Sequence, residues 1–215
     1  MAAPVKRTYT STLRADQARR TQQAIVAAAA RLFVERGWGQ ATIDAVAEEA
    51  GVSRKTVFTS GGGKVDLLKL ALDWSLVGDD EPVPLAERPE IAATMRLSDP
   101  ETFLAGWARI LTDINKRVAG LHRVLISAAG VDPAAQTLLD EWETQRWSFT
   151  AGSLVPHLQR LGALRAGLPP EQAIDIMWLH GDPIVYARLV LERRWTPEQF
   201  EVWLQDSLVR QLLAP

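Results

Sequence analysis

The 215-residue chain contains no cysteine, which excludes disulfide bonds, thiolate nucleophiles and thiolate metal sites. Its three histidines, His122, His157 and His180, are too scattered to form a recognisable metal-binding motif, so we expect neither a metal nor another cofactor. No nucleophile, base and orienting group occur in a catalytic pattern, and we do not expect an enzyme. A catalytic site assembled from residues far apart in the sequence stays open as an alternative.

Long apolar runs are also missing. No segment approaches the roughly 20 apolar residues of a membrane-spanning helix, and residues 1–13 lack the apolar core of a signal peptide. We therefore expect a cytoplasmic protein that does not enter a membrane. A hydrophobic content of 47% argues against a disordered chain.

Charge is distributed unevenly along the chain. Residues 1–72 contain 11 Lys and Arg against 6 Asp and Glu, whereas residues 73–215 contain 13 against 20. The length suits one small and one medium domain, and we expect an N-terminal domain over residues 1–72, with a basic arm, and a C-terminal domain over residues 73–215. A basic N-terminal domain favours contact with phosphate groups, although ordinary scatter of surface charge gives similar counts.

The segment TIDAVAEEAGVSRKTVF, residues 42–58, has the spacing of a helix-turn-helix. Ala47 is small enough for a second helix to cross closely, and Gly51 suits a tight turn between the two helices. Val57 repeats the apolar contacts of the first helix on the second. Ser53 precedes the second helix and is a natural N-cap for it.

The first turns of this second helix carry cations and hydroxyl groups. This part of a recognition helix usually enters the major groove of DNA. A helical hairpin buried in a bundle seldom leaves such groups on its outer face, so we predict that they contact DNA. The residues concerned are Ser53, Arg54, Lys55, Thr56 and Thr59.

A wider pattern surrounds the motif and covers about the first third of the chain. It consists of Ile25, Ala28, Ala29, Phe33, Gly37, Thr42, Val46, Ala47, Ala50, Gly51, Val52, Ser53, Thr56, Phe58, Lys64 and Leu67. This pattern resembles the N-terminal domain of the TetR/AcrR family of bacterial transcriptional regulators. The resemblance implies an all-α homodimer of about nine helices, in which a three-helix DNA-binding domain precedes a larger helical domain for ligand binding and dimerisation.

The same resemblance assigns DNA-contacting or contact-supporting positions of the family to Thr42, Arg54, Lys55, Thr56, Phe58 and Lys64. The chain departs from the family at the end of the recognition helix. Phe58 lacks the usual tyrosine hydroxyl, and Ser60 and Gly61 stand where the family usually has His and Phe. We expect a looser helix end there, with Gly61, Gly62 and Gly63 as a flexible joint.

Helical patterning resumes after a connection at residues 78–98 and covers about 100–118, 120–130, 133–163, 170–193 and 197–213. The last two helices carry more apolar surface than a two-helix hairpin can cover, which predicts a dimer interface. Packing within one subunit is the competing explanation. The predicted interface residues are Ile184, Val185, Leu189, Val190, Trp203, Leu204 and Leu208.

Seven of the eight tryptophans follow residue 73, and several fall where a pocket between helices could form. Aromatic walls suit flat apolar ligands, although aromatic residues at helical spacing also form plain core. The predicted ligand-binding residues are Phe103, Trp107, Ile110, Trp142, Gln145, Trp147, Trp178, His180 and Asp182, with Phe149 as a further aromatic candidate and Arg109 as a further polar one.

Together these features predict a homodimeric, ligand-responsive transcriptional regulator that acts as a repressor. It would bind a palindromic, double-stranded DNA operator and be released by a small apolar or aromatic effector. The main alternative is a helix-turn-helix module controlled by a protein partner or by no effector.

Overall fold

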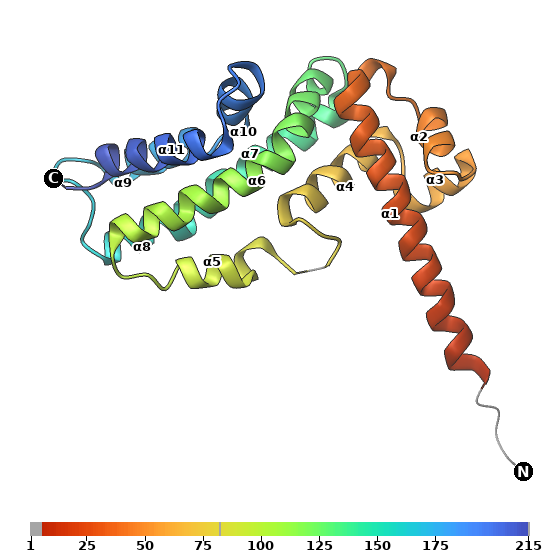
Figure 1. The fold of residues 1–215 in the computed structure, drawn as a ribbon, viewed down its shortest axis with the longest axis horizontal. Helices are drawn as coiled ribbons and strands as arrows, with labels where there is room; N and C mark the ends of the chain where they lie inside the picture. The colour runs from red at the N-terminus through yellow and green to blue at the C-terminus, as the bar shows by residue number, and fades with distance from the viewer. Residues whose placement is uncertain (1–5, 82, 215) are drawn as a thin grey trace, which may run out of the picture. The chain divides into compact units, whose positions relative to one another are not determined.

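The computed structural model describes residues 6–81 and 83–214, with side chains from Arg14 onward. The chain divides into two compact units, one ending at Asp73 and one starting at Trp74. Within the described residues no β-strand forms, and Leu164 and Leu213 make an isolated antiparallel bridge. The predicted all-α fold is confirmed (Figure 1).

The first unit contains α1 (Lys6–Gln40), α2 (Ile43–Glu49), α3 (Arg54–Gly61) and the beginning of α4 (Lys64–Val77). Helices α1, α2 and α3 pack against one another in pairs. Their shared core includes Ile25, Leu32, Phe33, Val46 and Val57, all buried. Because α1 already begins at Lys6, the residues expected as a basic arm belong to this helix, namely Lys6, Arg7, Arg14, Arg19 and Arg20.

Local signals fix the ends of these short helices. Thr42 Oγ1 accepts a hydrogen bond from Ala45 N–H at the start of α2, and Ser53 Oγ accepts one from Thr56 N–H at the start of α3. Each satisfies a backbone donor that has no partner inside the helix. Gly51 has a φ of 66° in the turn between α2 and α3, a conformation that costs glycine little.

The second unit begins with the end of α4 and continues through η1 (Leu85–Glu87), α5 (Pro89–Thr94), α6 (Pro100–Ala129) and α7 (Pro133–Phe149). It then contains the π-helical turn η2 (Thr150–Leu154), α8 (Val155–Arg160), α9 (Pro170–His180), α10 (Pro183–Tyr186), the π-helical turn η3 (Ala187–Glu192) and α11 (Pro197–Leu212). Helix α6 packs against α5, α7, α10 and α11. Its buried face supplies much of the core of this unit.

Two helix boundaries differ from the sequence prediction. Residues 100–118 and 120–130 were expected as separate helices, but α6 runs through Gly120 without a break. A single glycine inside a helix costs only about 1 kcal/mol, and the apolar spacing of α6 continues on both sides of it. The segment 170–193 was expected as one helix, but Pro183 starts a new helix after Gly181 because proline lacks the N–H group needed inside a helix.

Candidate functional site

The recognition helix α3 presents its first-turn cations to solvent. Arg54 and Lys55 are exposed, and so are Phe58 and Thr59. Arg54 Nη1 lies 2.9 Å from a carboxylate oxygen of Asp44 on α2, and its guanidinium lies 5.6 Å from the centre of the Phe58 ring. Lys55 forms no ion pair among the described residues. The two neighbouring cations therefore differ, since Arg54 is held by a carboxylate and Lys55 is available.

The predicted hydroxyl contacts also have structural roles. Thr42 and Ser53 cap α2 and α3, and the Ser53 hydroxyl lies 2.8 Å from that of the half-buried Thr56. Thr59 Oγ1 donates to the backbone carbonyls of Lys55 and Thr56. These bonds fix the orientation of the four hydroxyl groups.

Lys64 points back toward the end of α1. Its ammonium group donates a hydrogen bond to the carbonyl oxygen of Trp38 and lies 4.2 Å from the centre of the Trp38 ring. The side chain is half-buried. Lys64 therefore joins the start of α4 to α1 in this structure, in addition to the DNA-contacting position that the family resemblance assigns to it.

The end of α3 is closed rather than loose. Gly61 is buried, and a Cβ atom placed there would lie 2.5 Å from Leu67 Cδ2. Leu67 thus occupies the space beside Gly61, which explains why no large side chain is needed there. Gly62 N–H donates to Phe58 O, and Gly63 N–H donates to Asp66 Oδ2 at 2.8 Å, so two of the three glycines expected to form a flexible joint are hydrogen-bonded in this structure.

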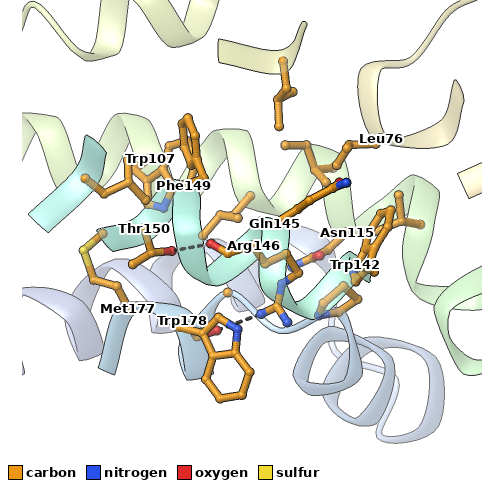
Figure 2. Close-up of a pocket in the computed structure, with 17 residues that line it drawn as sticks. Leu76, Trp107, Asn115, Trp142, Gln145, Arg146, Phe149, Thr150, Met177 and Trp178 are labelled. Carbon is orange, nitrogen blue, oxygen red and sulfur yellow. Dashed lines mark hydrogen bonds between the residues drawn. The ribbon is translucent and has the colours of Figure 1, made fainter. Parts of the chain in front are cut away.

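The second unit contains a cavity of about 230 Å³ (Figure 2). Its walls come from α6, α7, η2 and α9, with further residues from the end of α4 and from η1. The lining residues are Leu76, Leu85, Trp107, Leu111, Ile114, Asn115, Val118, Trp142, Gln145, Arg146, Phe149, Thr150, Leu154, Met177, Trp178, Gly181 and Pro183. On α6 they recur every three to four residues, so one face of that helix forms a wall.

Five of the predicted ligand-binding residues meet at this cavity. Five aromatic or amide side chains of the set line it, namely Trp107, Trp142, Gln145, Phe149 and Trp178. Trp107 and Phe149 form a ring pair with centres 5.7 Å apart. Sequence reasoning placed these residues on helices, and the packing of α6, α7 and α9 brings them together.

The other predicted residues do not line the cavity, and Arg109 among them is exposed. Phe103 and Ile110 are buried elsewhere in the core, with the Phe103 ring 4.5 Å from that of His157, and Trp147 is 46% exposed on the outside of α7. His180 bonds Ile176 O and Gln211 Nε2 and stacks on Trp203. Asp182 accepts from Ile184 N–H as the cap of α10. These are structural contacts that their sequence positions did not reveal.

Asn115 is a pocket residue that the sequence prediction missed. It is 1% exposed, and neither its Oδ1 nor its Nδ2 has a hydrogen-bond partner among the described residues. The indole Nε1 atoms of Trp142 and Trp178 are also buried and have no hydrogen-bond partner among the described residues. A buried amide without a hydrogen bond costs about 1–3 kcal/mol, so these groups mark unsatisfied polar positions in the lining of the cavity. The signal in the sequence was an amide at helical spacing from Trp107 and Leu111.

Arg146 is the charged side chain in the lining. Its guanidinium donates to Glu143 Oε2 at 2.6 Å and to Trp178 O at 2.8 Å, and it lies 3.7 Å from Asp182. Glu143 also lies 3.4 Å from the buried His122. Burial raises the pKa of Glu143, but His122 and Arg146 outweigh it and hold the pKa below the usual glutamate value. The charge of Arg146 is thus balanced from outside the cavity lining.

The predicted dimer residues fall into two groups. Leu204 and Leu208 are 0% exposed in the single subunit, because α11 packs this face against α6 and α9. Their assignment to a subunit interface is wrong, and the competing explanation of internal packing holds for them. Ile184, Val185, Leu189, Val190 and Trp203 are half-buried. Large exposed apolar residues lie nearby in the sequence at Leu179, Leu191 and Val202.

The three histidines lie in separate surroundings. His157 bonds Leu97 O, His180 bonds Ile176 O, and His122 is buried beside Trp142. In the part of the chain that the structure describes, no three His, Cys, Asp or Glu side chains form a group suited to a metal ion. No helix of that part is both long and apolar enough to cross a membrane.

The fold and the exposed recognition helix define a helix-turn-helix protein of the transcription-regulator class. Residues 25–71 match the family model described as bacterial regulatory proteins, tetR family. The HTH-type transcriptional regulator YdeS of Bacillus subtilis (strain 168) is 29% identical over 197 residues, which cover 90% of this chain and 86% of YdeS.

Solved structures with the same fold include NalD, the secondary repressor of the MexAB-OprM multidrug efflux pump in Pseudomonas aeruginosa. NalD is 20% identical with a TM-score of 0.64, and the match covers 92% of this chain and 98% of the NalD chain. SmeT, solved as a complex with triclosan, is 14% identical with a TM-score of 0.67. The match covers 90% of this chain and 91% of the SmeT chain. The chain is thus similar to transcriptional regulators of the tetR family, by its sequence over residues 25–71 and by its fold over about nine-tenths of its length.

Proposed function

We propose that the protein is a homodimeric repressor that binds a palindromic operator and leaves it when a small molecule fills the cavity of the second unit. The observation that carries this proposal is the recognition helix α3, which is capped by Ser53 and exposes Arg54 and Lys55. The proposed DNA contacts are Thr42, Ser53, Arg54, Lys55, Thr56, Phe58, Thr59 and Lys64. The protein would act in the cytoplasm, where bacterial DNA lies.

Two copies of α3 are needed for such an operator. A two-fold dimer presents its recognition helices about one DNA turn apart, roughly 34–36 Å, and so reads two half-sites. Each copy contributes the same cations and hydroxyls to its half-site. A single short helix makes too few contacts for the affinity of a specific complex.

The surface that we assign to the dimer is the outer apolar side of the last helices of the second unit. Val202 on α11 is 67% exposed, and Leu179 and Leu191 are also exposed. The half-buried residues of the predicted interface belong to the same helices, namely Ile184, Val185, Leu189, Val190 and Trp203. A second copy of the chain fits best, because an isologous interface pairs the same apolar patch with itself.

A matched pair of substitutions tests this surface. Val202→Glu places an unpaired charge in the proposed interface, so we expect a monomer that has lost operator binding. Val131→Glu makes the same chemical change at a residue that is 77% exposed after α6, and we expect it to stay dimeric. Sedimentation velocity measures both. A dimeric Val202→Glu variant with normal operator binding would show that the interface lies elsewhere.

The effector site is supported by the largely apolar cavity with its ring pair of Trp107 and Phe149. Leu76 lines it and belongs to α4, the continuous helix that follows the recognition helix in the chain. A ligand that binds more tightly when α4 takes one position would shift the dimer toward the state with that position. The size of the shift is set by the difference between the ligand's affinities for the two states. The likeness to NalD, a repressor, and to SmeT, solved with triclosan, supports the same combination of roles.

Selection of bound fragments from the source genome tests the DNA-binding part. We expect recovery of palindromic sites by the wild-type protein and no enrichment by an Arg54→Ala, Lys55→Ala variant that remains dimeric. Ligand release is then measured on the recovered operator, and reciprocity requires that an effector bind more weakly to the DNA-bound protein by the same factor. Equal enrichment by wild type and variant would contradict the role of α3.

A further inference from the structure

The wall of the cavity contains an amide group that the protein itself does not satisfy. Asn115 lies on the α6 face that lines the cavity, is 1% exposed, and has no partner for either polar atom among the described residues. Buried polar side chains in native proteins are almost always hydrogen-bonded. Since Asn115 borders the cavity, a molecule inside the cavity is in a position to supply the missing bonds.

The chemistry of the amide specifies what such a molecule offers. A primary amide presents an acceptor oxygen and a donor NH₂ group side by side. The complementary edge has a donor and an acceptor next to each other, as in a lactam or a cis amide. The unpaired indole N–H of Trp142 in the same lining adds a donor and favours further acceptor oxygens on the ligand.

The charges around the cavity favour a neutral ligand. No Asp or Glu occurs among the lining residues, so nothing there compensates a buried cation. The lining contains the guanidinium of Arg146, which already donates to Glu143 and to Trp178 O. A cationic ligand would meet this positive charge, and an anionic ligand would compete with Glu143 for it.

The shape of the cavity favours a short, flat molecule. In Figure 2 Trp107 and Phe149 lie on one side of the cavity and Asn115 and Trp142 on the other. Trp107 and Asn115 are eight residues apart on α6, which is about 12 Å along the helix axis. One or two fused rings can contact the ring pair of Trp107 and Phe149 and direct a polar edge toward Asn115.

We propose that the cavity recognises neutral, flat aromatic molecules with a lactam or cis-amide edge, and that Asn115 is the residue that determines this specificity. This inference rests on the proposed effector site. The ligand would belong to this chemical class, and the side chain of Asn115 would recognise its polar edge. The aromatic walls provide contact area, and Asn115 discriminates between molecules of equal area.

Calorimetric titration with four probes tests the proposal. The probes are 2-quinolinone, which has the lactam edge, 1-methyl-2-quinolinone, which lacks its donor, quinoline, which lacks the carbonyl, and the cation 1-methylquinolinium. We expect the wild-type protein to bind 2-quinolinone about tenfold more tightly than either neutral analogue, and the cation most weakly. In the Asn115→Leu variant the preference for 2-quinolinone should disappear while quinoline still binds.

Gln159→Leu provides the matched control, because Gln159 is an exposed amide on α8 that does not line the cavity. We expect it to bind all four probes as the wild type does. The melting temperature without a probe checks the fold. Asn115→Leu should melt at the same temperature as the wild type or higher, because it removes an unsatisfied buried amide. A clearly lower melting temperature would show that Asn115 has a structural partner and would overturn the proposal.

The failure of the inference can be distinguished from failure of the effector site. Equal affinities of the wild-type protein for the three neutral probes, or tightest binding of the cation, would overturn the role of Asn115 but leave the cavity as an effector site. If no probe binds the wild-type protein, both the inference and the aromatic effector site are contradicted. Operator binding by α3 is measured separately and does not depend on these results.

Discussion

Replacing Lys55 by Ala should reduce the salt dependence of operator binding. Lys55 is the second residue of α3, is exposed, and forms no ion pair among the described residues. Its ammonium group can therefore approach a phosphate without giving up a partner. Arg54 differs, since it must leave Asp44, which lies 2.9 Å away. Lys55 is thus the clearer probe of phosphate contact.

The size of the effect follows from counterion release. Each phosphate neutralised on duplex DNA contributes about −0.9 to the slope of log K against log salt concentration. A dimer carries two copies of Lys55, so the slope of the Lys55→Ala variant should be shallower by about 1.8. When the salt concentration rises from 50 to 200 mM, the factor by which operator affinity falls should therefore be roughly twelve times smaller for the variant than for the wild type.

Fluorescence anisotropy of a labelled operator over this range of salt concentrations measures the slope. Lys69→Ala is the matched control, because Lys69 is an exposed lysine on α4 that pairs with Asp73. We expect its slope to equal that of the wild type. A Lys55→Ala variant that keeps the wild-type slope would refute the assignment of Lys55 to a phosphate, whatever its absolute affinity.

Two further predictions concern stability. Gly62→Ala should lower the free energy of unfolding by about 1–3 kcal/mol, because Gly62 has a φ of 77° and a Cβ atom there would meet Asp66 Oδ2 at 2.5 Å. Gly63→Ala, with its nearest contact at 3.5 Å, should have a much smaller effect, and equal urea midpoints for the two variants would contradict this explanation. Glu143→Gln should destabilise the protein at neutral pH, because the pKa of Glu143 is lowered in the folded state and its stabilisation is present above the unfolded value near 4.5. This stabilisation is lost as the pH falls through the pKa of Glu143 in the folded state, so the urea unfolding curves of the variant and the wild type should converge in acid. A difference in stability that persists in acid would show that the charge of Glu143 does not cause it.

The helix-turn-helix was predictable from the sequence because its determinants are local. The cap Ser53, the turn at Gly51 and the buried Val57 all lie within seven residues, and the structure has each in the expected role. Capping and left-handed turns depend on residues next to one another in the chain. The same reasoning gave the all-α class, since helical periodicity is visible along the sequence.

Tertiary structure decided which helical faces meet, and this determined the cavity. Periodicity groups residues of one helix on a face, but it does not say what covers that face. Leu208 and Val202 are both apolar residues of α11, yet Leu208 is buried within the subunit and Val202 is exposed. Asn115 acquires its proposed importance only because α7 and α9 enclose the wall of α6 on which it lies. The sequence by itself determined the local motif and the helices, and only their packing decided which side chains form the core, the cavity and the surface.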